Sequence, residues 1–162
     1  MNSKAATRIS REIVINAPSA KIFEALTEPK QLAKWWGDEQ FYKWTNVEHD
    51  FRVQGAWEMS GSDARGNPLS IKGVYRTIEA PFELYQTWAY DFSQSGFRDS
   101  MVRYSLRERD GVTRLSMTHT GFRLSDKRGR SKGWTSVLGW LRRYAEQPFN
   151  APSEPAGAEL VD

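Results

Sequence analysis

The segment that most constrains the fold is Ser131–Gln147, with the sequence SKGWTSVLGWLRRYAEQ. Its large apolar residues recur at intervals of three and four, so they share one broad face of a helix. The residues on this face are Trp134, Val137, Leu138, Leu141, Tyr144 and Ala145. The helix must bury this face, and a sheet built from the preceding strands is the available partner. The space between helix and sheet is then either packed core or a ligand cavity.

The chain before this helix alternates polar and apolar residues, which is typical of strands. A first strand over 8–16 is followed by short helices over 19–27 and 29–36, introduced by Pro18 and Pro29. Further strands are predicted at 44–49, 56–61, 69–78, 82–90, 100–108 and 112–120. Two inward faces are open for the 44–49 strand: Trp44, Asn46 and Glu48, or Thr45, Val47 and His49. The order predicts an α+β fold, β-α-α-β6-α, with a curved antiparallel sheet round the last helix.

Turn and charge signals set the boundaries of these elements. Residues 62–68 and the Asp110-Gly111 pair predict hairpin turns, and Gly73 inside a strand predicts a bulge or a close backbone approach. Residues 122–132 are basic, and positive charge opposes a helix N-terminus. We therefore expect the last helix to begin near Gly129–Ser131, unless packing supports its first turns. One domain is expected over residues 8–147, with a frayed start at 1–7 and a disordered tail at 149–162.

Several classes of function lack their sequence signals. There is no cysteine, so disulfides, thiolate metal sites and cysteine nucleophiles are excluded. The histidines, His49 and His119, are not at a metal-ligand spacing, and no phosphate-binding glycine motif or serine-nucleophile motif occurs. A net charge of +3 and a basic run without interleaved aromatics give weak support for nucleic acid. Without a membrane span or signal peptide we expect a cytoplasmic protein with no cofactor or metal.

The interior composition gives the most useful functional signal. The chain has 7 Trp, 6 Tyr and 8 Phe residues, and aromatic side chains line both cores and ligand pockets. Gln86, Tyr104 and His119 lie at inward positions on different strands. A buried polar group without a partner costs about 1–3 kcal/mol. The three residues therefore indicate either a pocket with a few placed polar groups or a closed core in which they bond one another or water.

Several motifs together resemble one known family. They are RxIxINAPxxxIFxALTxPxxLxxWW over 11–36, GAWEM over 55–59, KGVYRTIEAP over 72–81, LYQTW over 84–88, TRLSMTHTGF over 113–122 and GW at 133–134. In this order and spacing they resemble the Hsp90-ATPase-activator-homologue branch of the START-like, or Bet v 1-like, superfamily. The resemblance implies a helix-grip fold with a cavity between the sheet and the last helix. The superfamily includes lipid and sterol carriers, polyketide cyclases, antibiotic-sequestering proteins and Hsp90 co-chaperone domains.

These observations lead to one preferred function and two alternatives. The preferred function is non-enzymatic binding of a small apolar, aromatic or lipid-like molecule. The expected ligand-binding residues are Trp36, Trp57, Tyr75, Gln86, Trp88, Tyr104, Met117, His119, Trp134 and Leu138. One alternative is a cyclase-like or hydrolase-like enzyme with His119 or Tyr104 as acid or base. The other is an Hsp90 co-chaperone-like module with an exposed apolar patch near Trp140, in a monomer or homodimer.

Overall fold

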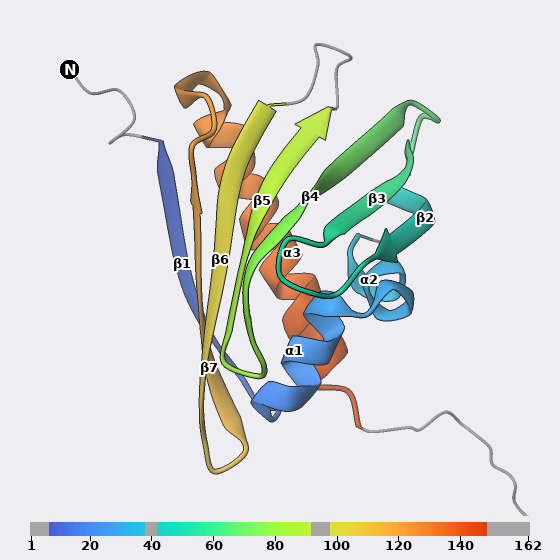
Figure 1. Ribbon diagram of the computed structural model, residues 1–162. Coiled ribbons are helices and arrows are strands. Elements are labelled where there is room, and N and C mark those ends of the chain that lie inside the picture. The colour runs from blue at the N-terminus through green and yellow to red at the C-terminus, as the bar shows by residue number, and fades with distance from the viewer. Residues whose placement is uncertain (1–6, 38–41, 92–97, 149–162) are drawn as a thin grey trace, which may run out of the picture.

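A computed structural model describes residues 7–37, 42–91 and 98–148 (Figure 1). Its elements are β1 (Arg8–Ile15), α1 (Ser19–Thr27), α2 (Pro29–Trp35), β2 (Tyr42–His49), β3 (Ala56–Asp63), β4 (Pro68–Glu79), β5 (Glu83–Asp91), β6 (Arg98–Arg109), β7 (Val112–Thr120), the short 3-10 helix η2 (Leu124–Asp126) and α3 (Lys127–Ala145). This order confirms the predicted α+β, β-α-α-β6-α fold. Residues 1–6 of the expected frayed start, and the expected tail, lie outside the described residues.

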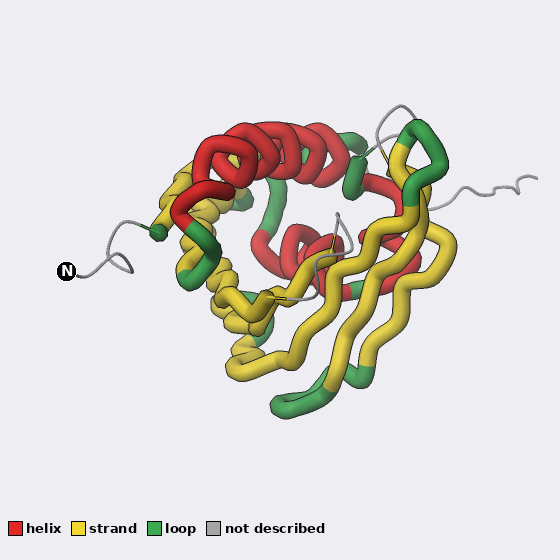
Figure 2. Tube along the Cα trace, turned by 90° about the horizontal axis from the view of Figure 1, so that it is seen from above, coloured by secondary structure: helices red, strands yellow, loops and turns green. Residues whose placement is uncertain are grey.

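The strands form one antiparallel sheet in the order β1-β7-β6-β5-β4-β3-β2. Seen from above, the sheet curves, and the helices close its open side (Figure 2). The predicted apolar face of α3 is buried at Trp134, Val137, Leu138, Leu141 and Ala145, while Tyr144 is half-buried. The buried face predicted from the 3.6-residue period of the last helix is therefore confirmed. This face packs against the concave side of the sheet.

A β-bulge in β2 explains why the sequence offered two inward faces for this strand. Trp44 pairs with Gly61 of β3, but the next pair joins Asn46 to Ser60, so the register shifts by one residue. Such a bulge turns the following side chains to the opposite face. Trp44 belongs to one of the two predicted inward faces and Val47 to the other, and both side chains pack against the core.

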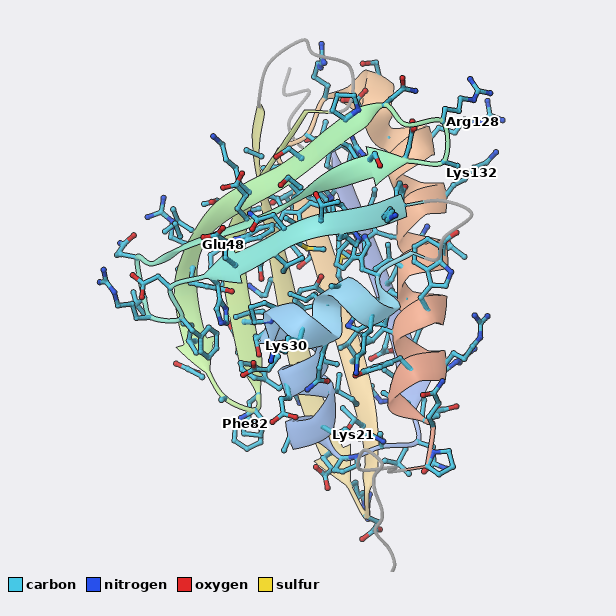
Figure 3. All side chains as sticks on the ribbon, turned by 90° about the vertical axis from the view of Figure 1, so that its right-hand side faces the viewer. Lys21, Lys30, Glu48, Phe82, Arg128 and Lys132 are labelled. Atoms are coloured by element: carbon cyan, nitrogen blue, oxygen red, sulfur yellow. The ribbon has the colours of Figure 1, made fainter. Side chains whose placement is uncertain are left out.

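The last helix begins earlier than predicted. It starts at Lys127 and not near Gly129–Ser131. The 3-10 turn η2 leads directly into it, and the Asp126 carboxylate lies at its N-terminus, 3.6 Å from Arg123 Nε. An acidic group at this end offsets part of the unfavourable positive charge. The side chains of Arg128 and Lys132 point outward from α3, so water screens their charge further (Figure 3).

Two local predictions about turns and strands are confirmed. Asp110 and Gly111 both have positive φ, 54° and 81°, as the tight hairpin between β6 and β7 requires. At Gly73 an ideal Cβ would lie 1.9 Å from the backbone oxygen of Thr87. Only a residue without a side chain allows β4 to approach β5 this closely, so the predicted close backbone approach is what this glycine provides.

Candidate functional site

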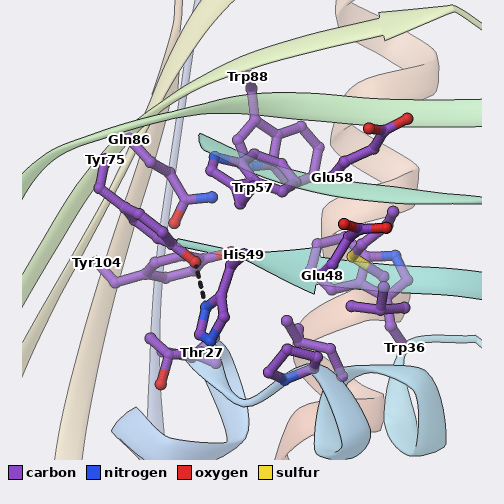
Figure 4. Close-up of a pocket in the computed structure, with 15 residues that line it drawn as sticks. Thr27, Trp36, Glu48, His49, Trp57, Glu58, Tyr75, Gln86, Trp88 and Tyr104 are labelled. Atoms are coloured by element: carbon purple, nitrogen blue, oxygen red, sulfur yellow. Dashed lines mark hydrogen bonds between the residues drawn. The ribbon is translucent and has the colours of Figure 1, made fainter. Parts of the chain in front are cut away.

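Six of the ten predicted ligand-binding residues line one internal cavity of about 20 Å³ between the sheet and the two short helices (Figure 4). They are Trp36, Trp57, Tyr75, Gln86, Trp88 and Tyr104. The first follows α2 directly, and the other five lie on β3, β4, β5 and β6. This free volume holds about one water molecule, so the aromatic rings fill most of the space beneath the sheet.

A second cavity, of about 50 Å³, lies beside the first, and Trp36 and Trp88 form part of the wall of both. Trp134 and Arg130 of α3 border this second cavity. The ring centroids of Trp36 and Trp88 are 5.4 Å apart, and those of Trp88 and Trp134 are 5.3 Å apart. At these separations the rings attract one another, so this tryptophan cluster is a stable partition between the two cavities.

The first cavity contains polar groups that lack partners. Tyr104 and Gln86 are 2% and 7% exposed, and no hydrogen bond joins either side chain to another group in the described part of the chain. Trp57 and Trp88 also belong to the wall of this cavity, and their indole N–H groups are buried without acceptors. Polar groups in protein interiors normally have a partner, so the Tyr104 hydroxyl and the Gln86 amide indicate a place for water or for a ligand's polar atoms.

His49 also lines this cavity, although it was not among the predicted binding residues. Its Nδ1 is 3.0 Å from the Tyr75 hydroxyl (Figure 4). Its ring stacks on Phe51, with ring centroids 5.2 Å apart. Burial lowers the pKa of His49, although the nearby carboxylates of Glu28 and Asp50 act in the opposite direction. His49 is therefore neutral near pH 7. The bulge in β2 is the feature that places it here, and strand periodicity alone could not locate that bulge.

His119 occupies a different environment, in a chain of hydrogen bonds within the core. Trp134 Nε1 donates to its Nδ1 at 2.9 Å, and its Nε2 lies 2.8 Å from Ser100 Oγ. The Ser100 hydroxyl donates to the backbone oxygen of Trp88 at 2.8 Å. Since Nδ1 accepts, Nε2 carries the proton and donates to Ser100, so every group in the chain is satisfied.

The environment of His119 keeps the imidazole neutral. Burial, with a smaller contribution from the positive charge of Arg130, lowers the pKa of His119 to about 3. His119 lies outside both cavities, as do Met117 and Leu138, which are buried in the core. The structure thus gathers six predicted residues round the first cavity, places Trp134 at the second, and packs the remaining three into the core.

An exposed apolar patch was predicted near Trp140 on the outer flank of α3. Trp140 is half-buried and meets the Tyr42 ring edge-on, with centroids 6.2 Å apart. The large apolar side chains that are exposed lie elsewhere, and Phe82, at the β4–β5 turn, is the most exposed of them (Figure 3). Within residues 7–37, 42–91 and 98–148, no helix is long and apolar enough to cross a membrane, and no cluster of three His, Asp or Glu side chains could hold a metal.

The curved sheet gripping α3 over an aromatic interior defines a helix-grip α+β protein of the START-like class. The family model described as "Activator of Hsp90 ATPase homolog 1-like protein" matches residues 16–146. The chain belongs to this family, which confirms the resemblance carried by its motifs.

Solved structures share this fold. Protein CV1439 from Chromobacterium violaceum is 25% identical, with a TM-score of 0.78 over 88% of this chain and 99% of that one. Protein NE0264 from Nitrosomonas europaea is 17% identical, with a TM-score of 0.72 over 88% and 96% of the two chains. CalU16 from Micromonospora echinospora is 22% identical, with a TM-score of 0.64 over 86% and 76%. No curated protein matches the chain significantly.

Proposed function

We propose that this protein binds a small apolar or aromatic molecule between the sheet and its helices, without catalysing a reaction. The observation that supports the proposal is the aromatic-lined cavity whose wall includes Gln86 and Tyr104, two buried residues whose polar groups can face a ligand. Apolar walls with a few placed polar groups are characteristic of small-molecule sites. Burial of the ligand's apolar surface would supply affinity at about 25 cal/mol per Å².

Binding requires the cavity to enlarge, because its free volume is about 20 Å³. The adjoining cavity of about 50 Å³ offers the route for this enlargement, since Trp36 borders both. Trp36 follows the last residue of α2 and precedes Gly37, whose φ of 82° marks a sharp change in chain direction. A movement of the Trp36 ring would therefore join the two spaces while the strands of the sheet stay in place.

The enzyme alternative has less support. Both ring nitrogens of His119 are hydrogen-bonded, and this side chain reaches neither cavity. Burial raises the pKa of Tyr104, so its hydroxyl can donate a hydrogen bond but does not become a base near neutral pH.

The proposal can be tested with the neutral fluorescent probe N-phenyl-1-naphthylamine and with native mass spectrometry of the protein purified from its own host. Saturable binding of one probe per chain is expected. Met59→Phe adds a ring to the cavity wall and should weaken probe binding at least tenfold, whereas Phe82→Ala, at an exposed turn, should not change it. A released stoichiometric small molecule in the mass spectrum would identify the natural ligand class. Probe binding that Met59→Phe leaves unchanged would show that the ligand lies elsewhere.

A further inference from the structure

We infer that the cavity selects a neutral aromatic molecule carrying a carbonyl-type hydrogen-bond acceptor, and rejects a carboxylate of the same shape. This inference rests on the proposed function and specifies the chemistry of its ligand. Its basis is the pair of polar side chains Tyr104 and Gln86 in the cavity wall, and the acidic rather than basic character of the charged residues that line it.

The unpartnered donors converge on one region of the cavity. Leu84 of β5 is directly opposite Tyr104 of β6, and Gln86 is opposite Val102, so Gln86 and Tyr104 are diagonal neighbours on the inner face of the sheet. Diagonal neighbours across strands are about 7–8 Å apart, which allows one bound atom to contact both side chains. Figure 4 shows the two side chains extending from the sheet toward the same space. A tyrosine hydroxyl and a carboxamide N–H suit a carbonyl oxygen of the ligand.

The neighbouring polar side chain is already occupied. The Tyr75 hydroxyl is 3.0 Å from His49 Nδ1, which leaves Tyr104 and Gln86 as the hydroxyl and amide groups free to bind a ligand. Tyr104 and Gln86 can each donate a hydrogen bond toward the same point of the cavity, so a ligand with an acceptor atom at that point fits this part of the wall.

The charges round the cavity argue against an anionic ligand. The charged residues that line it are Glu48 and Glu58, both acidic, and His49 is neutral near pH 7. Arg130 borders the second cavity, beyond the partition formed by Trp36 and Trp88. A carboxylate buried beside Tyr104 and Gln86 would lack a counter-charge, which makes its desolvation strongly unfavourable. A neutral carbonyl avoids this penalty and keeps the same hydrogen bonds.

The small free volume fits this interpretation. About 20 Å³ accommodates one water molecule, which could bridge the Tyr104 hydroxyl and the Gln86 amide when no ligand is bound. A ligand carbonyl oxygen would replace that water and its hydrogen bonds, whereas a hydrocarbon would displace the water and leave both groups unsatisfied. The cavity should therefore distinguish ketones from hydrocarbons of equal size.

The test uses three probes with one ring system: 2-acetylnaphthalene, 2-ethylnaphthalene and 2-naphthoate, titrated against the full chain at pH 7.5 by tryptophan fluorescence and calorimetry. The ketone should bind about 5–20-fold more tightly than the hydrocarbon, as expected for one or two net hydrogen bonds. The carboxylate should bind at least 100-fold more weakly than the ketone. In Tyr104→Phe the ratio of ketone to hydrocarbon affinity should fall at least threefold, and Phe82→Ala should keep the ratio of the unmodified protein.

Each result separates this inference from the broader proposal. Equal affinities for ketone and hydrocarbon, or a carboxylate that binds as tightly as the ketone, would overturn the inference while leaving cavity binding intact. No binding of any of the three probes would overturn both. The comparison among probes is made on the unmodified protein, so it stands even if Tyr104→Phe does not fold.

Discussion

At the scale of single residues, His119 and His49 show how similar sequence positions acquire different roles. Both lie at strand ends and both are neutral near pH 7. His119 is enclosed by Trp134 and Ser100, which use both of its ring nitrogens. His49 shares a cavity wall with Tyr75 and keeps one ring nitrogen outside that hydrogen bond. The first histidine therefore stabilises the core, and the second can respond to a ligand.

The buried hydrogen bonds of His119 predict a pH dependence of stability. Its pKa is about 3 in the folded protein, against an ordinary value of 6.5 for a histidine, so the unfolded chain takes up the proton first as pH falls. The stability contributed by neutral His119 is complete above about pH 6.5 and is lost progressively from there toward pH 3, by at most about 1.4 kcal/mol per pH unit. Urea unfolding should show a free energy about 2 kcal/mol lower at pH 5 than at pH 7.5 from this residue.

The control for this prediction uses each histidine in turn. His119→Gln should cost about 1–3 kcal/mol at pH 7.5, because Trp134 and Ser100 lose their buried partner. It should also remove most of the fall between pH 7.5 and 5. His49→Gln should remove a smaller part, since burial lowers the pKa of His49 in the same direction. If the free energy of unfolding of His119→Gln still falls as much between pH 7.5 and 5 as that of the unmodified protein, the pH dependence comes from other groups.

At the scale of secondary structure elements, local sequence and tertiary packing each decide different features. The start of α3 at Lys127 depends on the preceding turn and on the acidic Asp126, which together outweigh a basic first turn. The bulge in β2 depends on how this strand pairs with β3. Neither feature follows from periodicity, because periodicity reports which face is apolar and not how an element begins or pairs.

Two glycines, one in a helix and one in a strand, test the separate effects of local sequence and of tertiary packing. An added Cβ at Gly129 of α3 would meet nothing within 4 Å, so Gly129→Ala should stabilise the protein by about 0.5–1 kcal/mol through helix propensity. At Gly73 the added Cβ would lie 1.9 Å from the backbone oxygen of Thr87. Gly73→Ala should therefore destabilise the sheet by about 1–3 kcal/mol or more. Thermal unfolding of the two variants measures whether each substitution raises or lowers stability. A Gly73→Ala protein as stable as the unmodified protein would contradict the close approach of β4 to β5.

At the scale of the whole molecule, the tryptophan partition connects the sheet with the helices. Trp36 from the end of α2, Trp88 from β5 and Trp134 from α3 meet with ring centroids between 5.3 and 6.1 Å apart. The sheet and two helices thus meet at one aromatic cluster, with a small cavity on each side of it. The proposed ligand binding would therefore be coupled to stability at this cluster.

Removing the Trp36 ring should lower the stability of the protein and strengthen its binding of a probe. Trp36→Ala should lower the free energy of unfolding by about 3–5 kcal/mol, because it leaves a large apolar cavity. The two existing cavities should then merge, and the neutral probe N-phenyl-1-naphthylamine should bind more tightly. The backbone oxygen of Trp36 still accepts the hydrogen bond from Trp44 Nε1, at 2.8 Å, so the end of α2 should remain in place.

Trp140→Ala, on the outer flank of α3, is the matched control for Trp36→Ala. Trp140→Ala removes the same ring from a half-buried position that borders neither cavity. It should lower stability less and leave probe affinity unchanged. Weaker or unchanged probe binding in a folded Trp36→Ala protein would show that the two cavities do not join at this ring.

The sequence by itself determined the order of elements, the apolar face of α3, the Asp110-Gly111 hairpin and the family. These features rest on local periodicity, on turn chemistry and on motifs, which neighbouring residues encode. Only the tertiary structure decided that His119 is part of the core, that His49 lines a cavity, and that this cavity has a free volume of about 20 Å³. Strand phase tells which side chains point inward, but free volume depends on how rings from distant elements fill the same space, and differences of a single methylene matter there.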